Sequence, residues 1–125
     1  MAEYKAIHGT LFQHKTSDPL GAGVANGTWS SGGNLNTARY TGGGAGIQTA
    51  ASLFGGAPGT IANHEYYDGS AWSEQTDVNT GRSSAGSSGT QTASILAGGF
   101  TDANVDSTET WDGTSWTEVN ELNTA

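Results

Sequence analysis

The sequence contains no cysteine, only two prolines and only four basic residues among its 125 positions. Without cysteine the chain can form no disulfide bond, no thiolate nucleophile and no cysteine-based metal site. Twelve acidic residues bring the net charge to -8, so nucleic acid and anionic membrane surfaces are unsuitable partners. No apolar run approaches the roughly 20 residues of a membrane span, and the first residues, MAEYKAIH, do not resemble a signal peptide. We therefore expect a soluble protein without a cleaved secretory signal.

Sequence motifs for catalysis are also missing. No phosphate-binding loop, nucleophile elbow or catalytic triad can be placed. The three histidines, His8, His14 and His64, form no closely spaced metal-binding pair. The oxygen-rich stretch TDANVD at 101–106 matches no established calcium loop in its ligand spacing. We expect no enzymatic activity and no cofactor.

Small residues are abundant, and only 34% of the residues are hydrophobic. The 20 glycines suit short strands joined by tight turns better than helices. Disorder is the alternative interpretation of such a composition. However, four tryptophans, four tyrosines and three phenylalanines recur at regular places, and disordered segments are poor in aromatic residues. The composition therefore predicts an all-β protein with little material for a conventional core.

One unit of sequence occurs twice, with a period of 43 or 44 residues. A shift of 43 aligns GIQTAA at 46–51 with GTQTAS at 89–94, and a shift of 44 aligns YDGSAW at 67–72 with WDGTSW at 111–116. A fixed period of this length is typical of stacked supersecondary units. We therefore divide the chain into four parts. They are a non-repeating segment (1–23), a partial unit with a surplus outer strand (24–37) and two full repeats (38–80 and 81–125).

Each full repeat is predicted to hold four short antiparallel strands. In the first repeat they are placed near 39–43, at 47–54, at 64–67 and from Trp72 onward. The Asp-Gly pair before that tryptophan predicts a tight hairpin, because such turns need positive φ. Asp68 and Asp112 are therefore interpreted as turn residues and not as catalytic acids. The same four strands are expected in the second repeat.

These landmarks resemble a known repeat family. An apolar stretch closed by Gly55-Gly56, an aromatic residue followed by aspartate at 67–68, and the later Trp72 look like the kelch motif, whose unit is a four-stranded blade of a β-propeller. The wording GxQTA, YDGSxW and xLNTA is further similar to kelch-like repeats in tail-fibre and other virion proteins of marine and cyanobacterial phages. The resemblance covers residues 24–125. The turn before Trp72 is shorter than in the usual kelch unit and matches the phage-like variant.

Six aromatic residues are candidates for glycan stacking or for packing between blades. They are Trp29, Tyr66, Tyr67, Trp72, Trp111 and Trp116. Because three of the tryptophans stand at one fixed place in their units, packing between sheets is the favoured interpretation for them. Arg39 and Arg82 each follow an Asn-Thr landmark and are expected to pair with an acid or a backbone carbonyl of the neighbouring unit.

Two blades cannot close a propeller, which needs about four to eight, and each blade buries a face only against its neighbour. The sequence therefore predicts self-assembly. Three chains would give a six-bladed ring, and two chains would suffice if the segment 1–23 is an irregular first blade and not an attachment or assembly element. The resemblance implies a structural or adhesive virion component such as a tail fibre, with a host-surface glycan or another virion protein as partner. A lectin-like glycan-binding module is the alternative.

Overall fold

The computed structural model describes residues 30–123, which contain eight strands and no helix. The strands all belong to one compact unit that begins at Gly32. The first sheet consists of β1 (Gly43–Ile47), β2 (Ala50–Phe54), β3 (His64–Tyr67) and β4 (Trp72–Glu74). The second consists of β5 (Gly86–Thr90), β6 (Ala93–Ala97), β7 (Thr108–Trp111) and β8 (Trp116–Val119). Within this part of the chain there is no helix of the length and apolarity that crossing a membrane requires.

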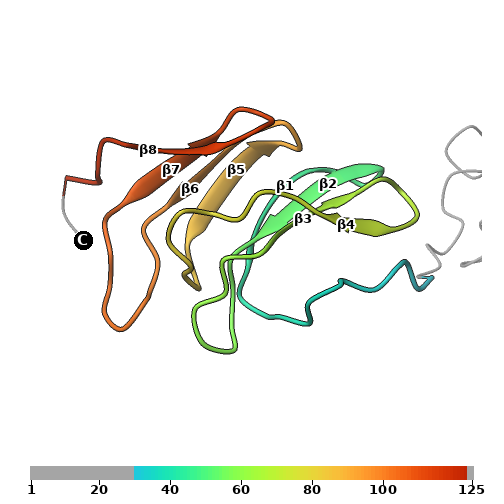
Figure 1. Cartoon of the computed structure of the whole chain (residues 1–125), viewed down its shortest axis with the longest axis horizontal. Coiled ribbons are helices and arrows are strands. Elements are labelled where there is room, and N and C mark those ends of the chain that lie inside the picture. The colour runs from blue at the N-terminus through green and yellow to red at the C-terminus, as the bar shows by residue number, and fades with distance from the viewer. Residues whose placement is uncertain (1–29, 124–125) are drawn as a thin grey trace, which may run out of the picture. The chain divides into compact units, whose positions relative to one another are not determined.

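Each sheet is an antiparallel meander whose strands pair in chain order (Figure 1). The predicted all-β class, with four short antiparallel strands in each repeat, is confirmed. The strand at 64–67 and the return strand that begins at Trp72 lie where the sequence placed them. The tip between them holds Gly69 with a φ of 96°, the positive value that the Asp-Gly signal predicted.

The predicted strand at 47–54 is wrong in its first half. Residues 48 and 49 form the turn of a hairpin, and the strand before them is β1, which begins at Gly43 and not near residue 39. Glycine is unfavourable in strands, so the sequence GGAG at the start of β1 carried no strand signal. Crowding explains why glycine stands there. A Cβ atom on Gly43 would lie 2.8 Å from a ring carbon of Phe54 and 3.1 Å from a methyl group of Leu96.

The Gly55-Gly56 pair ends β2 and brings the first sheet against the start of the second repeat. Both residues have positive φ, 65° and 121°, which L side chains rarely adopt. A Cβ atom on Gly55 would lie 2.6 Å from the carbonyl oxygen of Arg82. The N–H of Gly56 donates a hydrogen bond of 2.8 Å to the same oxygen. The glycine pair therefore allows a backbone contact between the repeats that a side chain would block.

The two sheets pack along a junction at which β1 lies beside β5 (Figure 1). The Ser87 hydroxyl on β5 accepts the N–H of Gly44 at 2.9 Å and donates to the Gly44 carbonyl at 3.0 Å. Five buried side chains form the hydrophobic core. They are Phe54 from the first sheet, Leu96, Trp111 and Trp116 from the second, and Val78 from the segment between them. The core thus lies between the sheets.

Each sheet has a junction face, which meets the other sheet, and an outer face. Strand register assigns the side chains to these faces, because residues directly opposite each other share a face. The junction faces carry Ser52, Phe54, His64 and Tyr66 on the first sheet, and Ser94, Leu96, Trp111 and Trp116 on the second. The outer faces carry Leu53, Tyr67 and Trp72 on the first sheet, and Ile95, Ala97, Thr108 and Thr110 on the second.

The repeat period relates these faces to each other. At the offsets of 43 and 44, Trp116 on the junction face of the second sheet corresponds to Trp72 on the outer face of the first. In the same way, His64 on the junction face of the first sheet corresponds to Thr108 on the outer face of the second. The junction therefore joins opposite faces of the repeated unit, as in a head-to-tail stack.

Candidate functional site

His64 is the centre of the junction. Its side chain is fully buried, and four aromatic rings surround it edge-on. Their centroids lie at 4.7 Å (Trp111), 5.1 Å (Tyr66), 5.4 Å (Trp116) and 5.6 Å (Phe54) from the imidazole. Edge-to-face contacts at such distances stabilise a core beyond the burial of area alone. No repeated signal indicated this role, because the second repeat has threonine at the equivalent position.

The hydrogen bonds of His64 define one tautomer. The Trp116 indole can only donate, and its Nε1 lies 3.2 Å from Nδ1 of His64, so Nδ1 must accept. The proton of the neutral ring is then on Nε2, which lies 2.7 Å from the Ser52 hydroxyl and donates to it. Burial lowers the pKa of His64 to about 4. The neutral imidazole thus serves as the acceptor that holds the two sheets in register.

Three of the six candidate aromatic residues meet at this junction. Trp116 packs against Phe54 with a centroid distance of 4.9 Å, and the indole N–H of Trp111 donates to the phenol oxygen of Tyr66. These contacts cross from one sheet to the other. They enclose the rings of Trp111 and Trp116, which are therefore inaccessible to a glycan.

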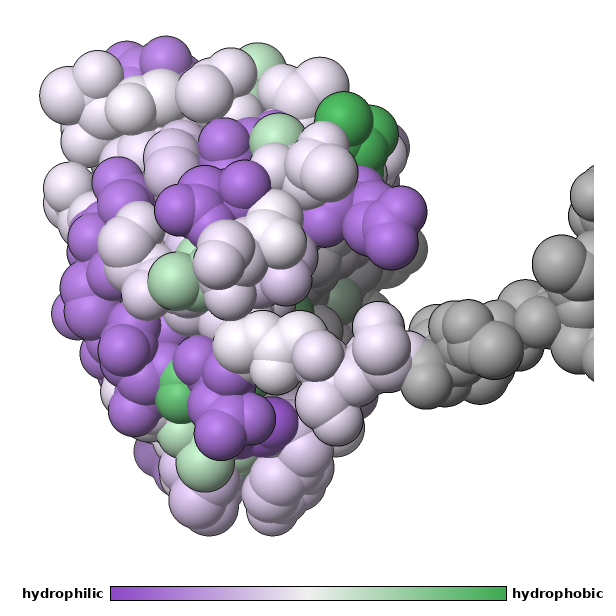
Figure 2. Space-filling model, turned by 90° about the vertical axis from the view of Figure 1, so that its right-hand side faces the viewer, coloured by the Kyte–Doolittle hydropathy of each residue, from purple (hydrophilic) through white to green (hydrophobic). Residues whose placement is uncertain are grey.

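Two further candidates, Tyr67 and Trp72, lie together on the outer face of the first sheet. Their rings are 5.1 Å apart and half-buried, and the Trp72 indole donates to the carbonyl of Gly33 at 3.1 Å. The side of the molecule on which β4 lies is mostly hydrophilic or neutral, with few hydrophobic residues (Figure 2). Trp29, the sixth candidate, lies outside the described residues.

The two arginines form buried ion pairs at matching places. Arg39 bonds to Glu65 at 2.8 Å, and Arg82 bonds to Glu109 at 2.6 Å. The acid partner expected of each arginine is therefore present, but it lies within the same repeat and not in the neighbouring one. Each guanidinium also donates to a backbone carbonyl of its own repeat, Arg39 to Asn63 and Arg82 to Ser107. Among the hydrogen bonds that these two arginines make within the described residues, the one from Gly56 to the backbone carbonyl of Arg82 joins the two repeats.

The Asn-Thr landmarks belong to the same assembly as these ion pairs. The backbone N–H groups of Asn36 and Asn79 each donate a 2.8 Å hydrogen bond to the paired glutamate, and the Asn amides donate to the Trp72 and Trp116 carbonyls at 3.0 Å. Buried charges are tolerated when they are paired and hydrogen-bonded in this way. In the sequence, these asparagines, arginines and glutamates were recognisable only because they recur at the period of the repeat. That common period was the sequence signal that they form one assembly.

Asp68 and Asp112 hold the hairpin tips. Oδ1 of Asp68 accepts the N–H groups of Ser70 and Ala71, both at 2.8 Å. These hydrogen bonds, with that from Ala71 first, lower the pKa of Asp68, and the equivalent bonds lower the pKa of Asp112. Such carboxylates stay ionised and are fully engaged by the turn. The part of the chain that the structure describes contains no cluster of three or more acidic or histidine side chains that could hold a metal.

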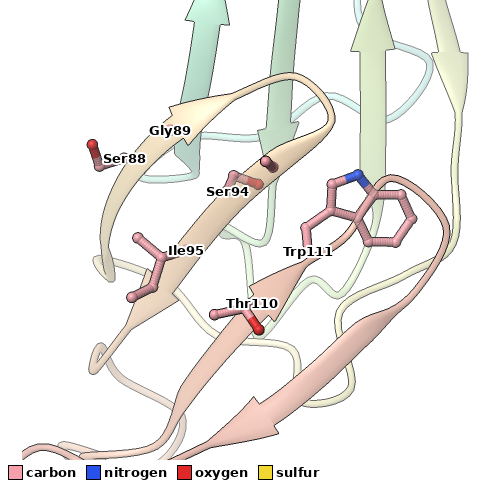
Figure 3. A pocket seen from close by; sticks show the side chains of 7 residues that line it. Ser88, Gly89, Ser94, Ile95, Thr110 and Trp111 are labelled. Atoms are coloured by element: carbon pink, nitrogen blue, oxygen red, sulfur yellow. The ribbon is translucent and has the colours of Figure 1, made fainter.

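The outer face of the second sheet is hollowed. An open depression of about 340 Å³ is lined by side chains that include Ser88, Ala93, Ile95 and Thr110. In Figure 3, Ile95 lies on one side of the sheet, whereas Trp111 lies on the side of the first sheet's translucent green strands. Ile95 is 39% exposed. On this face the second repeat has threonine in place of His64 and Tyr66, and the larger Ile95 in place of Ser52.

Thr108 on the same face is 5% exposed, and its hydroxyl has no hydrogen-bond partner among residues 30–123. A buried hydroxyl without a partner costs about 1–3 kcal/mol. The junction residue that corresponds to it, His64, does have a donor from the next sheet. The Thr108 hydroxyl is covered by the chain itself and does not line the hollow of this face.

No family model matches this chain, and none of the curated proteins that were compared with it matches either.

Proposed function

We propose that the chain is a structural or adhesive virion component, of a tail fibre or a similar appendage, built from kelch-like propeller blades that several copies of the chain complete. The observation that carries this proposal is the head-to-tail packing of the two sheets. Opposite faces of one repeated unit meet at the junction, and this geometry adds units without changing the contact. A ring of such units needs more sheets than the two that residues 30–123 supply.

The placement of the polar groups supports a structural role over a catalytic one. His64 is enclosed by four rings and is used as an acceptor for Trp116. Both arginine–glutamate pairs are buried, and each glutamate accepts a backbone N–H from the unit that precedes its own, from Asn36 and Asn79. These groups organise the fold, and none of them is presented to a substrate. The role in a virion rests on the resemblance of the repeat wording to phage appendage proteins.

Immunogold labelling tests the virion role. Antibodies raised against the purified chain would be applied to phage particles isolated from the producing host, with particles of an unrelated phage as control. Label on the appendages of the particles is expected. Label that is confined to the cell extract and never found on particles would contradict a virion role.

A lectin-like module is the second candidate, and the Tyr67–Trp72 pair favours it. Two half-buried rings on an outer face can offer an apolar platform to a sugar ring. A glycan array that includes host surface polysaccharides tests this function. Saturable binding that Trp72→Ala abolishes, while the buried-ring variant Trp111→Phe retains it, would support a lectin. The absence of any glycan signal from the folded protein would exclude it.

A further inference from the structure

We infer that the hollow on the outer face of the second sheet binds the side chain of Gln48 from another copy of this chain. In this contact the glutamine amide donates hydrogen bonds to the main-chain carbonyls of Ser94 and Trp111. The inference rests on the proposed assembly from several copies. It adds the side chain that joins one copy to the next and the site that receives it.

The same contact exists inside the chain, between its two repeats. Gln91 lies in the turn between β5 and β6, and its side-chain amide donates to two carbonyls of the first sheet, at 3.0 Å to Ala51 and at 2.9 Å to Tyr67. Ala51 and Tyr67 stand opposite each other on β2 and β3, with their side chains on the outer face. The glutamine amide therefore reaches their main chain from the junction face.

The first sheet carries the same donor. Gln48 is the counterpart of Gln91 at the shift of 43, in the same GxQTA motif. Its side chain is exposed and has no hydrogen-bond partner among residues 30–123. Gly32 and Gly33 lie against Tyr67 and Ser70, near the turn between β3 and β4, and leave Gln48 exposed. The turn between β1 and β2 thus presents a free amide.

Gln48 differs in this respect from the other counterparts of the junction donors. Among the described residues, four side chains of the second sheet donate hydrogen bonds across the junction, and they are Ser87, Gln91, Trp111 and Trp116. Their counterparts in the first repeat are Gly44, Gln48, Tyr67 and Trp72. Gly44 has no side-chain donor, Tyr67 has no indole, and the indole N–H of Trp72 is already bonded to the Gly33 carbonyl. Gln48 therefore keeps the donor of its counterpart in a free form.

The hollow holds the matching acceptors. Ser94 and Trp111 are the counterparts of Ala51 and Tyr67, and they too stand opposite each other, on β6 and β7. Both residues line the hollow of the outer face, although their side chains lie on the junction face, as Figure 3 shows for Trp111. The Ser94 hydroxyl is buried, so the main chain of this pair faces the hollow. A carbonyl oxygen has two lone pairs and can accept a second hydrogen bond besides one within the sheet.

The other residues of the hollow suit a neutral side chain. Small residues, Ser88, Gly89 and Ala93, form part of its lining and leave the main chain accessible. The lining contains no charged side chain, so nothing in it would neutralise a carboxylate or an ammonium group. An uncharged amide donates to two carbonyls without bringing a charge into the site. The chemistry of the hollow therefore matches glutamine.

The variant Gln48→Glu tests the contact. A carboxylate cannot donate to the two carbonyls and is repelled by them, so the dissociation constant of the assembly should rise about tenfold or more. Analytical ultracentrifugation of the full-length chain measures it. Gln75→Glu is the matched control, because it makes the same change of charge at a side chain that bonds to Ser73 of its own sheet. The control should assemble like the natural chain.

Stability in dilute solution separates a lost contact from a damaged fold. Gln48 is exposed, so Gln48→Glu should unfold at the same urea concentration as the natural chain. Gln91→Glu breaks the contact inside the chain and should unfold at a lower urea concentration. Unchanged stability of Gln91→Glu would show that this contact contributes nothing, and equal assembly of Gln48→Glu and natural chains would show that Gln48 does not join copies. Either result would overturn the inference.

Cross-linking tests which surfaces meet, and the absence of native cysteine makes it specific. Full-length chains with Thr49→Cys, beside Gln48, are mixed with chains that carry Ala93→Cys in the hollow, and a short bis-maleimide joins neighbouring thiols. Products that contain one chain of each kind are expected. If the chains assemble but only like chains or none are joined, the contact is refuted and the proposed assembly stands. A folded chain that stays monomeric at every concentration would refute both.

Discussion

The indole of Trp116 on β8 donates a hydrogen bond to Nδ1 of His64 on β3, at 3.2 Å and across the junction of the two sheets. This contact links opposite faces of two successive repeats. It needs a neutral imidazole, because a proton on Nδ1 of His64 would face the indole N–H of Trp116 and leave no acceptor for it. Protonated Nδ1 would instead donate to the carbonyl of Thr76, which lies 3.2 Å away. The junction is thus expected to depend on pH.

The stability of the chain should fall when His64 becomes protonated. Its pKa is about 4 in the folded chain, below the ordinary value of 6.5, so the unfolded chain binds the proton more readily between these values. The stabilising contribution is complete above pH 6.5 and is lost progressively as the pH falls toward 4. The total loss amounts to about 3 kcal/mol at most.

Urea denaturation at fixed protein concentration, from about pH 7.5 to about pH 4, measures this pH dependence of the unfolding free energy. The variant His64→Gln cannot titrate and reports the contribution of the carboxylates alone. The difference in unfolding free energy between the natural chain and this variant should decrease with acidification. A difference that stays constant over the whole range would show that His64 does not couple the fold to pH.

The two equivalent tryptophans should respond differently to truncation. Trp116→Ala opens a cavity in the core and removes the donor to His64, so a loss of about 3–5 kcal/mol is expected. Trp72→Ala removes a half-buried ring on the outer face, and a loss of about 1–2 kcal/mol is expected in dilute solution. Denaturation monitored by near-ultraviolet circular dichroism compares them. Equal losses in dilute solution would contradict the distinction between junction and outer face.

The buried ion pair of the second sheet should be strongly coupled. Glu109→Gln leaves the guanidinium of Arg82 buried without its charge partner, with an expected loss of about 3–5 kcal/mol. Adding Arg82→Met removes the unpaired charge and should restore part of this stability. A double-mutant cycle by chemical denaturation gives the coupling. Additive losses in the double variant would mean that the two side chains act independently.

Substitution of Gly55 in the glycine pair should destabilise the fold, both because of a steric clash and because of the positive φ. Gly55→Ala places a Cβ atom 2.6 Å from the Arg82 carbonyl at a φ of 65°. Gly59→Ala has a similar φ of 70° but nothing within 4 Å, so it isolates the conformational cost of about 1 kcal/mol. Thermal denaturation should show a clearly larger loss for Gly55→Ala. Similar losses would exclude a close backbone contact as the reason for this glycine.

The repeat period predicted the sheets because turn and strand signals recur in it. The Asp-Gly tip before Trp72 and the strand at 64–67 follow local rules, and both lie where the sequence placed them. The position of the glycine-rich β1 was predicted wrongly. Its Gly43 is required because Phe54 and Leu96 leave no room for a side chain, and strand propensity does not reveal such a requirement. That crowding exists only after the sheets have packed.

The candidate site was less accessible to sequence reasoning. The repeat period shows that Trp72 and Trp116 occupy equivalent positions. Only the strand register shows that Trp72 lies on an outer face and Trp116 at the junction. His64 was invisible because its repeat counterpart is Thr108. A residue that differs between repeats gives no repeated signal, and here His64 lies on the junction face of its sheet whereas Thr108 lies on the outer face of the other.

Native mass measurement of the purified full-length chain tests the central claim, that copies of this chain complete each other's fold. Spectra recorded over a range of protein concentrations are expected to show a discrete assembly of three copies, which would supply six four-stranded sheets. A folded chain that stays monomeric at every concentration would contradict the claim.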